Sequence, residues 1–191
     1  MFKKILLVFL VLIVGFVVYV ALQPADFEVK RTAVIDAPPE VVFAQVNDFH
    51  NWEAWSPWAK LDPNAKATFA GPDAGKGASF HWNGNAEVGE GTQTILESDP
   101  HEKIKIQLDF KKPMESSCVT DFTFTPVEGK TKVEWKMSGQ NNFVGRAFCV
   151  FMNMDKMVGG QFEEGLASLN KVVTTQPNAA TPVVPAELQG K

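Results

Sequence analysis

The chain has 191 residues, of which 45% are hydrophobic and 21% are charged, and its formal net charge at pH 7 is −4. This length accommodates one or two ordinary domains. The sequence contains two cysteines, which excludes a disulfide-rich miniprotein. From residue 23 onward it holds 16 basic and 22 acidic residues, a net charge of −6, without a Lys/Arg cluster. Because phosphate neutralisation needs local positive charge, no nucleic-acid partner is expected.

The N-terminal segment is strongly apolar. Residues 5–22 carry no charge, and a helix of about 18 residues at about 1.5 Å per residue can span a hydrocarbon core of roughly 30 Å. The alternative is a cleaved secretory signal, whose apolar region usually has about 7–15 residues and ends in a small-x-small site. Here the segment ends Tyr19-Val-Ala-Leu-Gln-Pro24, without a good small pair, and Tyr19 is typical of a membrane interface. We therefore expect residues 1–23 to form a membrane anchor.

The charges around this segment predict an orientation. Lys3 and Lys4 precede it, and basic residues favour the cytoplasmic side. We expect a single-pass protein of the inner (plasma) membrane with a periplasmic or otherwise extracytoplasmic domain. Because that domain is acidic, it is not expected to bind an anionic membrane surface directly. Membrane association should then rest on the anchor alone.

The C-terminal end differs from the rest of the chain. Residues 176–191 contain three prolines among Ala, Thr and Val and show no periodic apolar face, which is typical of a disordered tail. Residues 24–175 remain, about 150 residues that form a single domain.

The apolar period within this domain changes along the chain. Residues 27–36 alternate, which predicts a strand, and Arg31 falls in its apolar phase. The prolines at 38 and 39 predict a helix start. Residues 66–139 form short alternating runs separated by turn residues, which indicates an antiparallel meander. From residue 145 to 174, apolar residues recur at steps of three and four and predict one long closing helix, within which Gly159 and Gly160 suggest close packing or a bend.

Three stretches then resemble a known family, the START-like, polyketide cyclase/dehydrase and lipid-transport (SRPBCC) superfamily. They are Val34-Ile-Asp-Ala-Pro-Pro-Glu-Val-Val-Phe43, Asp48-Phe-His-Asn-Trp-Glu-Ala-Trp-Ser-Pro-Trp58 and Phe162-Glu-Glu-Gly-Leu-Ala-Ser-Leu169. The chain looks like a membrane-anchored bacterial branch. The resemblance implies an α+β helix-grip fold, a curved antiparallel sheet of about seven strands wrapped on a long C-terminal helix. It also implies a deep cavity between sheet and helix that accepts an apolar ligand in many relatives and is catalytic in some.

The strand phases predict which side chains line such a cavity. The apolar strand phases, the tryptophans after residue 50 and the apolar stripe of the closing helix give the expected ligand-binding residues Trp52, Trp55, Trp58, Phe80, Trp82, Ile106, Leu108, Phe110, Phe122, Phe124, Trp135, Met137, Phe151, Met154 and Phe162. The ionisable residues His81, Asp109, Asp121 and Glu134 fall in the solvent phase, so no catalytic residue is assigned and binding is favoured over catalysis.

Several of these residues have a structural alternative. Trp52, Trp55 and Trp58 form either the mouth of a ligand pocket or a lid that closes one end of the sheet. Arg31 is either a polar ligand contact or one member of a structural ion pair. Strand pairing places Cys118 near the start of the closing helix, where Cys149 lies, which allows a disulfide or two buried thiols.

Metal and cofactor sites are not expected. The three histidines at 50, 81 and 101 lie outside ligand spacing of one another and of either cysteine. No Gly-rich phosphate loop precedes a predicted helix.

Three functions follow from these patterns. The first is membrane-tethered binding of a small hydrophobic or lipid-like molecule between the sheet and the closing helix. The second is a cyclase- or dehydratase-type enzyme that acts on an aromatic or acyl substrate, which requires an ionisable group in the cavity. The third is a ligand-free interaction module with a filled interior.

Overall fold

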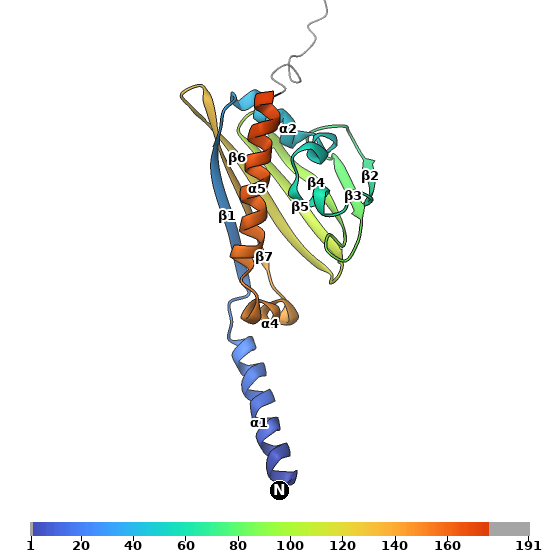
Figure 1. The fold of residues 1–191 in the computed structure, drawn as a ribbon, viewed down its shortest axis with the longest axis vertical. Coiled ribbons are helices and arrows are strands. Elements are labelled where there is room, and N and C mark those ends of the chain that lie inside the picture. Colours follow the sequence, from blue (N-terminus) through green and yellow to red (C-terminus); the bar gives the residue numbers. More distant parts are fainter. Residues whose placement is uncertain (1, 176–191) are drawn as a thin grey trace, which may run out of the picture.

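Seven antiparallel strands form one curved sheet in the order β1-β7-β6-β5-β4-β3-β2 (Figure 1). The coordinates are those of a computed structural model, which describes residues 2–175, so the predicted tail lies outside the described residues. The strands are β1 (Asp26–Ile35), β2 (Lys66–Ala70), β3 (Ser79–Asn83), β4 (Glu90–Asp99), β5 (Lys103–Lys112), β6 (Ser116–Val127) and β7 (Lys130–Gln140). The helices are α1 (Phe2–Ala21), α2 (Pro39–Asn47), the 3-10 helix η1 (Phe49–Ala54), α3 (Pro57–Leu61), α4 (Phe143–Phe151) and α5 (Met154–Thr175). The predicted α+β helix-grip fold is confirmed.

The alternating runs form the strands for the expected reason. Along β6 the apolar and threonine side chains of one phase are buried, while the intervening residues are more exposed. The turn between β6 and β7 contains Glu128 and Gly129, whose φ angles are 51° and 79°. Two left-handed residues in a two-residue loop match the twist of the flanking strands. This turn fixes the register in which Phe122 lies opposite Trp135.

The segment after β1 folds back over the inner face of the sheet. Pro39 begins α2, where its missing N–H costs no helical hydrogen bond. Asp48 then caps η1, because its carboxylate accepts a hydrogen bond of 2.9 Å from the backbone N–H of His50. The tryptophan-rich stretch is thereby held against the sheet.

The closing helix is not continuous, which corrects the prediction for residues 145–174. The chain leaves helical geometry at Met152, whose φ and ψ are −120° and 127°. Asn153 then caps α5, because its side-chain oxygen accepts a 2.9 Å hydrogen bond from the backbone N–H of Lys156. An asparagine side chain that satisfies a free N–H starts a new helix at this point. The apolar stripe continues in sequence, but α4 and α5 pack on different parts of the molecule (Figure 1).

Helix α1 projects away from the sheet at the end where α4 lies (Figure 1). It is the one helix among residues 2–175 that is long and apolar enough to cross a membrane. Of its side chains only Val20 is buried. Its last turn meets the domain, since Arg146 of α4 donates a 3.0 Å hydrogen bond through Nη1 to the carbonyl oxygen of Ala21.

Candidate functional site

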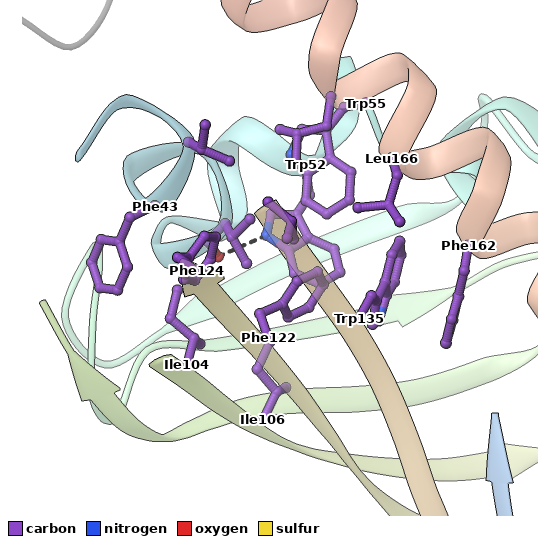
Figure 2. Close-up of a cluster of buried hydrophobic side chains, with 14 of the residues drawn as sticks. Phe43, Trp52, Trp55, Ile104, Ile106, Phe122, Phe124, Trp135, Phe162 and Leu166 are labelled. Carbon is purple, nitrogen blue, oxygen red and sulfur yellow. Dashed lines mark hydrogen bonds between the residues drawn. The ribbon is translucent and has the colours of Figure 1, made fainter. Parts of the chain in front are cut away.

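An aromatic cluster fills the space between α5, the tryptophan stretch and the middle of the sheet (Figure 2). The rings of Trp135 and Phe162 are stacked, with centroids 4.1 Å apart and an interplanar angle of 9°. Trp55 packs edge-on against Trp135 at 5.7 Å, and Phe122 lies 4.8 Å from Trp135. Each of these side chains is at most 2% exposed. The interior expected to be open is therefore packed with side chains here.

Hydrogen bonds fix the tryptophans in this cluster. Trp52 donates from Nε1 to the carbonyl oxygen of Val46 at 3.0 Å, and Trp55 donates to that of Gln45 at 3.2 Å. Gly165 of α5 makes room for Trp135, because a Cβ at this position would lie 2.8 Å from the indole ring. Trp58 is half-buried and contacts Trp135 and Phe162 at 5.9 and 6.2 Å. These contacts fit the lid alternative for the tryptophan stretch.

A second part of the inner face is only half-buried. Directly opposed residues in an antiparallel sheet share a face, and the register aligns Phe80 with Gln93 and Leu108, and Trp82 with Gly91 and Phe110. The chief packing partner of α5 in the sheet is β1, and the strand order places β5, β4 and β3 toward the opposite edge of the sheet. We call the surface formed by the half-buried side chains the aromatic shelf; its members are Phe80, Trp82, Gln93, Leu108 and Phe110.

Gly91 shapes the aromatic shelf. A Cβ on Gly91 would lie 2.5 Å from the ring of Trp82, so only glycine lets that indole lie across β4. Trp82 donates from Nε1 to the carbonyl oxygen of Val88 at 3.0 Å, which leaves its ring face for packing. Phe110 meets it edge-on at 5.8 Å. Gln93 supplies the one amide side chain of the shelf. Neither Gln93 nor Gly91 was among the predicted site residues. Both share the strand phase of Ile95, which places them on the inner face.

Arg31 points toward α5 and is engaged there. Its Nε donates to Glu163 Oε1 at 2.6 Å, and its Nη1 donates to Asp155 Oδ1 at 2.9 Å. These hydrogen bonds raise the pKa of Arg31, and the bond from Arg31 lowers the pKa of Asp155. A Cβ on Gly159 would overlap Arg31 Nη2, so only glycine leaves room here for the guanidinium over α5. The geometry matches the ion-pair alternative for Arg31.

The two cysteines are free thiols, so the disulfide considered for this pair is not formed. Cys118 lies opposite Gly139, close to the end of β7. Burial raises the pKa of Cys118 to about 12, which keeps the thiol protonated at neutral pH. Cys149 is half-buried in α4, where the side chain of Asn141 lies 3.6 Å from its sulfur.

The remaining predicted residues divide between the core and other places. Ile106, Phe124 and Met137 are buried in the core. Met154 is half-buried at the start of α5. Phe151 is 75% exposed and lies 5.9 Å from Phe16 of α1 rather than against the sheet. The break between α4 and α5 moves Phe151 away from the other predicted residues.

Two shallow depressions lie elsewhere on the surface. One, of about 500 Å³, is lined by residues of β1, β6 and β7 that include Glu28, Val119 and Ser138. The other, of about 210 Å³, lies between β1 and α5 and includes Glu163 and Asn170. Neither is lined by the aromatic cluster or the shelf. Across residues 2–175, no three His, Cys, Asp or Glu side chains are grouped so that they could hold a metal ion.

The sequence profile of a family described as polyketide cyclase / dehydrase and lipid transport matches residues 26–174. The chain belongs to this family. The match covers every strand of the sheet and all but the last residue of α5, and it begins after α1. Family membership supports a role in binding a small hydrophobic ligand or in cyclase-type chemistry. No curated protein matches the chain at the level needed to count as a relative.

Solved structures of other proteins share the fold of this family member. A protein from Nitrosospira multiformis is 22% identical, with 79% of this chain and 99% of that chain covered and a TM-score of 0.57. SA2116 from Staphylococcus aureus is 12% identical, with 81% and 98% covered and a TM-score of 0.59. CalU16 from Micromonospora echinospora is 15% identical, with 82% and 88% covered and a TM-score of 0.53. At these identities the likeness concerns the fold alone.

Proposed function

We propose that this protein is a membrane-anchored domain that binds a small hydrophobic or lipid-like molecule on the aromatic shelf. The observation that carries the proposal is the half-buried state of Phe80, Trp82, Leu108 and Phe110 on the inner face. Apolar side chains in that state gain free energy when a ligand removes them from water, at about 25 cal/mol per Å² of apolar surface. The buried aromatic cluster then serves as the rigid wall beside which the ligand lies.

The side chains of the shelf define the class of ligand. Trp82 and Phe110 offer ring surfaces that suit acyl or flat aromatic groups. Gln93 can donate and accept hydrogen bonds and therefore suits one neutral polar group, such as an ester or hydroxyl. None of the five shelf side chains is ionisable, and the nearby thiol of Cys118 is protonated at neutral pH. The shelf is therefore built for binding rather than for the proton transfer of a cyclase.

The anchor belongs to the same proposal. The contact of Arg146 with Ala21 and the burial of Val20 join α1 to the domain, which supports an anchor that is retained rather than a signal that is removed. Lys3 and Lys4 favour a cytoplasmic N-terminus and so an extracytoplasmic domain. Leu108 of the shelf lies toward the anchored end of the sheet, because it aligns with Cys118 and then with Gly139, just before the chain enters α4.

Photo-crosslinking in a bilayer tests the binding site. The full chain in phosphatidylcholine nanodiscs is irradiated with a diazirine-labelled fatty acid methyl ester, and the labelled peptides are identified by mass spectrometry. We expect labels on the peptides that contain Trp82 and Phe110 in addition to those of α1. Labels confined to α1 would refute the shelf as a ligand site and would favour an interaction module.

A pair of variants makes the test specific. Leu108→Glu places a charge on the shelf, while Leu96→Glu places the same charge on an exposed position of β4. Because an unpaired polar group on a binding surface costs about 1–3 kcal/mol, we expect shelf labelling to fall about tenfold or more in Leu108→Glu and to stay unchanged in Leu96→Glu. Equal labelling of both variants would contradict the proposal.

A further inference from the structure

We infer that α4 is a second membrane contact, an interfacial helix that lies in the lipid leaflet next to the domain. This inference rests on the proposed anchoring of the chain by α1. It differs from the expectation that the anchor alone holds the domain at the membrane. The evidence is the exposure of α4, its depth along α1 and the position of its one charge.

Helix α4 exposes apolar side chains that would be unfavourable in water. Among its nine residues, Phe143–Phe151, only Arg146 is charged, and none is buried. Val144, Phe148 and Phe151 are 55%, 44% and 75% exposed. Their spacing of four and three places them on one face of the helix. A short helix gains its stability from burial of such a face, so α4 needs an apolar environment that the domain does not supply.

The position of α4 along α1 indicates which environment this is. Phe151 contacts Phe16, with ring centroids 5.9 Å apart. Phe16 lies six residues before the end of the uncharged run at Leu22, or about 9 Å along the helix axis at about 1.5 Å per residue. If α1 spans the bilayer, Phe151 is at the same depth. Interfacial helices bury their apolar faces about 5–10 Å into the boundary between headgroups and acyl chains.

The single charge of α4 agrees with this placement. Arg146 points at the end of α1, where its Nη1 donates to the carbonyl oxygens of Ala21 at 3.0 Å and Gln23 at 3.5 Å. These carbonyls lack partners within α1, and a cation is favoured at a helix C-terminus. The guanidinium thus lies at the interfacial end of α1, while the uncharged residues of α4 extend to the level of Phe16. A helix that bound a protein partner would not need to lie at the depth of the membrane interface along α1.

Two attachments have a consequence for the proposed function. A single helix leaves the domain free to rotate and tilt about it, whereas α1 and α4 together fix the orientation of the sheet. The fixed end is the one that carries Leu108 of the aromatic shelf. The part of the shelf around Leu108 would then face the leaflet, from which a hydrophobic ligand would come.

Spin-label accessibility in vesicles tests the inference. Single cysteines are placed at Val144 or Phe148 in a chain with Cys118→Ala and Cys149→Ala, reconstituted in phosphatidylcholine vesicles. Collision rates with oxygen, which concentrates in lipid, and with a water-soluble nickel chelate are measured by power saturation. We expect Val144→Cys and Phe148→Cys labels to favour oxygen. An aqueous profile at both would overturn the inference and leave this face of α4 to a protein partner.

Two control positions separate this inference from the proposal on which it rests. A label at Glu128→Cys, in the turn between β6 and β7, should have an aqueous profile. The 11 residues of β7, at about 3.3 Å per residue, separate this turn from the α4 end of the sheet by about 33 Å. A label at Val11→Cys shows whether α1 lies in lipid. A lipid profile at Val11→Cys with aqueous α4 labels would refute the second contact and retain the anchor. An aqueous profile at Val11→Cys would refute the anchor and with it the second contact.

Discussion

The guanidinium of Arg31 lies over Gly159, so a strand residue and a helix glycine form one joint between β1 and α5. A Cβ at Gly159 would overlap Arg31 Nη2, whereas a Cβ at the neighbouring Gly160 would meet no atom within 4 Å. Asp155 and Glu163 bind the guanidinium from the same helix. The joint explains why a residue that weakens helices occurs in the middle of α5.

This joint predicts opposite behaviour for two adjacent glycines. Gly160→Ala should raise the free energy of unfolding by about 1 kcal/mol, the difference in helix propensity. Gly159→Ala should fail to give this gain, because the methyl group displaces Arg31 from its two carboxylates. Urea unfolding of the full chain in detergent measures both. In an Arg31→Ala background the two substitutions should become equivalent, and a persistent difference there would contradict this account of the joint.

The stacked pair of Trp135 and Phe162 should dominate the stability of the core. Phe162 is 1% exposed, and its truncation leaves a cavity beside the indole. Phe162→Ala should lower the free energy of unfolding by about 3–5 kcal/mol. Phe69→Ala, at a 40% exposed position of β2, is the matched control and should cost much less. Similar losses for the two variants would show that the interior is not packed as described.

Two ion-paired aspartates should make the fold sensitive to acid. Arg31 and Lys130 donate hydrogen bonds that lower the pKa values of Asp155 and Asp36. An aspartate in the unfolded chain titrates near pH 4, at about 3.9. A carboxylate with a lowered folded-state pKa stabilises the protein above that pH and loses this contribution as the pH falls through the folded value. The free energy of unfolding should therefore decrease below about pH 4.

The acid sensitivity is assigned with single variants. Asp36→Asn and Asp155→Asn should each flatten the decrease between about pH 4 and pH 2, as followed by urea unfolding at each pH. Asp73→Asn serves as the control, since Asp73 takes part in none of the ion pairs found within residues 2–175. A flattening of the same size in this control would show that the loss of stability in acid does not come from the two ion pairs.

The two thiols should differ in reactivity. Cys118 is 7% exposed and its pKa is raised to about 12 by burial, so little thiolate is present at pH 8. Maleimide labelling of the folded chain in detergent should modify Cys149 first and Cys118 only after urea is added. Cys118→Ala and Cys149→Ala variants assign each rate. Rapid labelling of Cys118 in the folded chain would contradict its buried position.

Local sequence patterns predicted most of the strands. The alternation in β5 and β6 specifies which side chains share a face, because the side-chain period of a strand is two. The same rule would have placed Gln93 among the predicted site residues, because Gln93 shares the phase of Ile95. Arg31 was correctly placed in the inward phase of β1. Its partners on α5 lie more than 120 residues away in the chain, and no local pattern could name them.

The break before α5 shows why periodicity alone was insufficient. Phe151 and Met154 keep the helical spacing of apolar residues on either side of Met152 and Asn153. The sequence pattern therefore does not mark the end of α4. The end arises from the hydrogen bond that Asn153 makes to the next turn and from the contact of α4 with α1. Phe151 was therefore assigned to the sheet side although it lies beside Phe16.

The amino-acid sequence by itself determined the apolar N-terminal run, the strand phases and the family resemblance, because each depends on residues close together in the chain. Only the tertiary structure decided that α5 and the tryptophans fill one part of the inner face and leave the aromatic shelf half-buried. It also decided that α4 faces outward beside α1. Periodicity tells which side chains share a face, whereas what covers that face depends on packing between segments far apart in sequence.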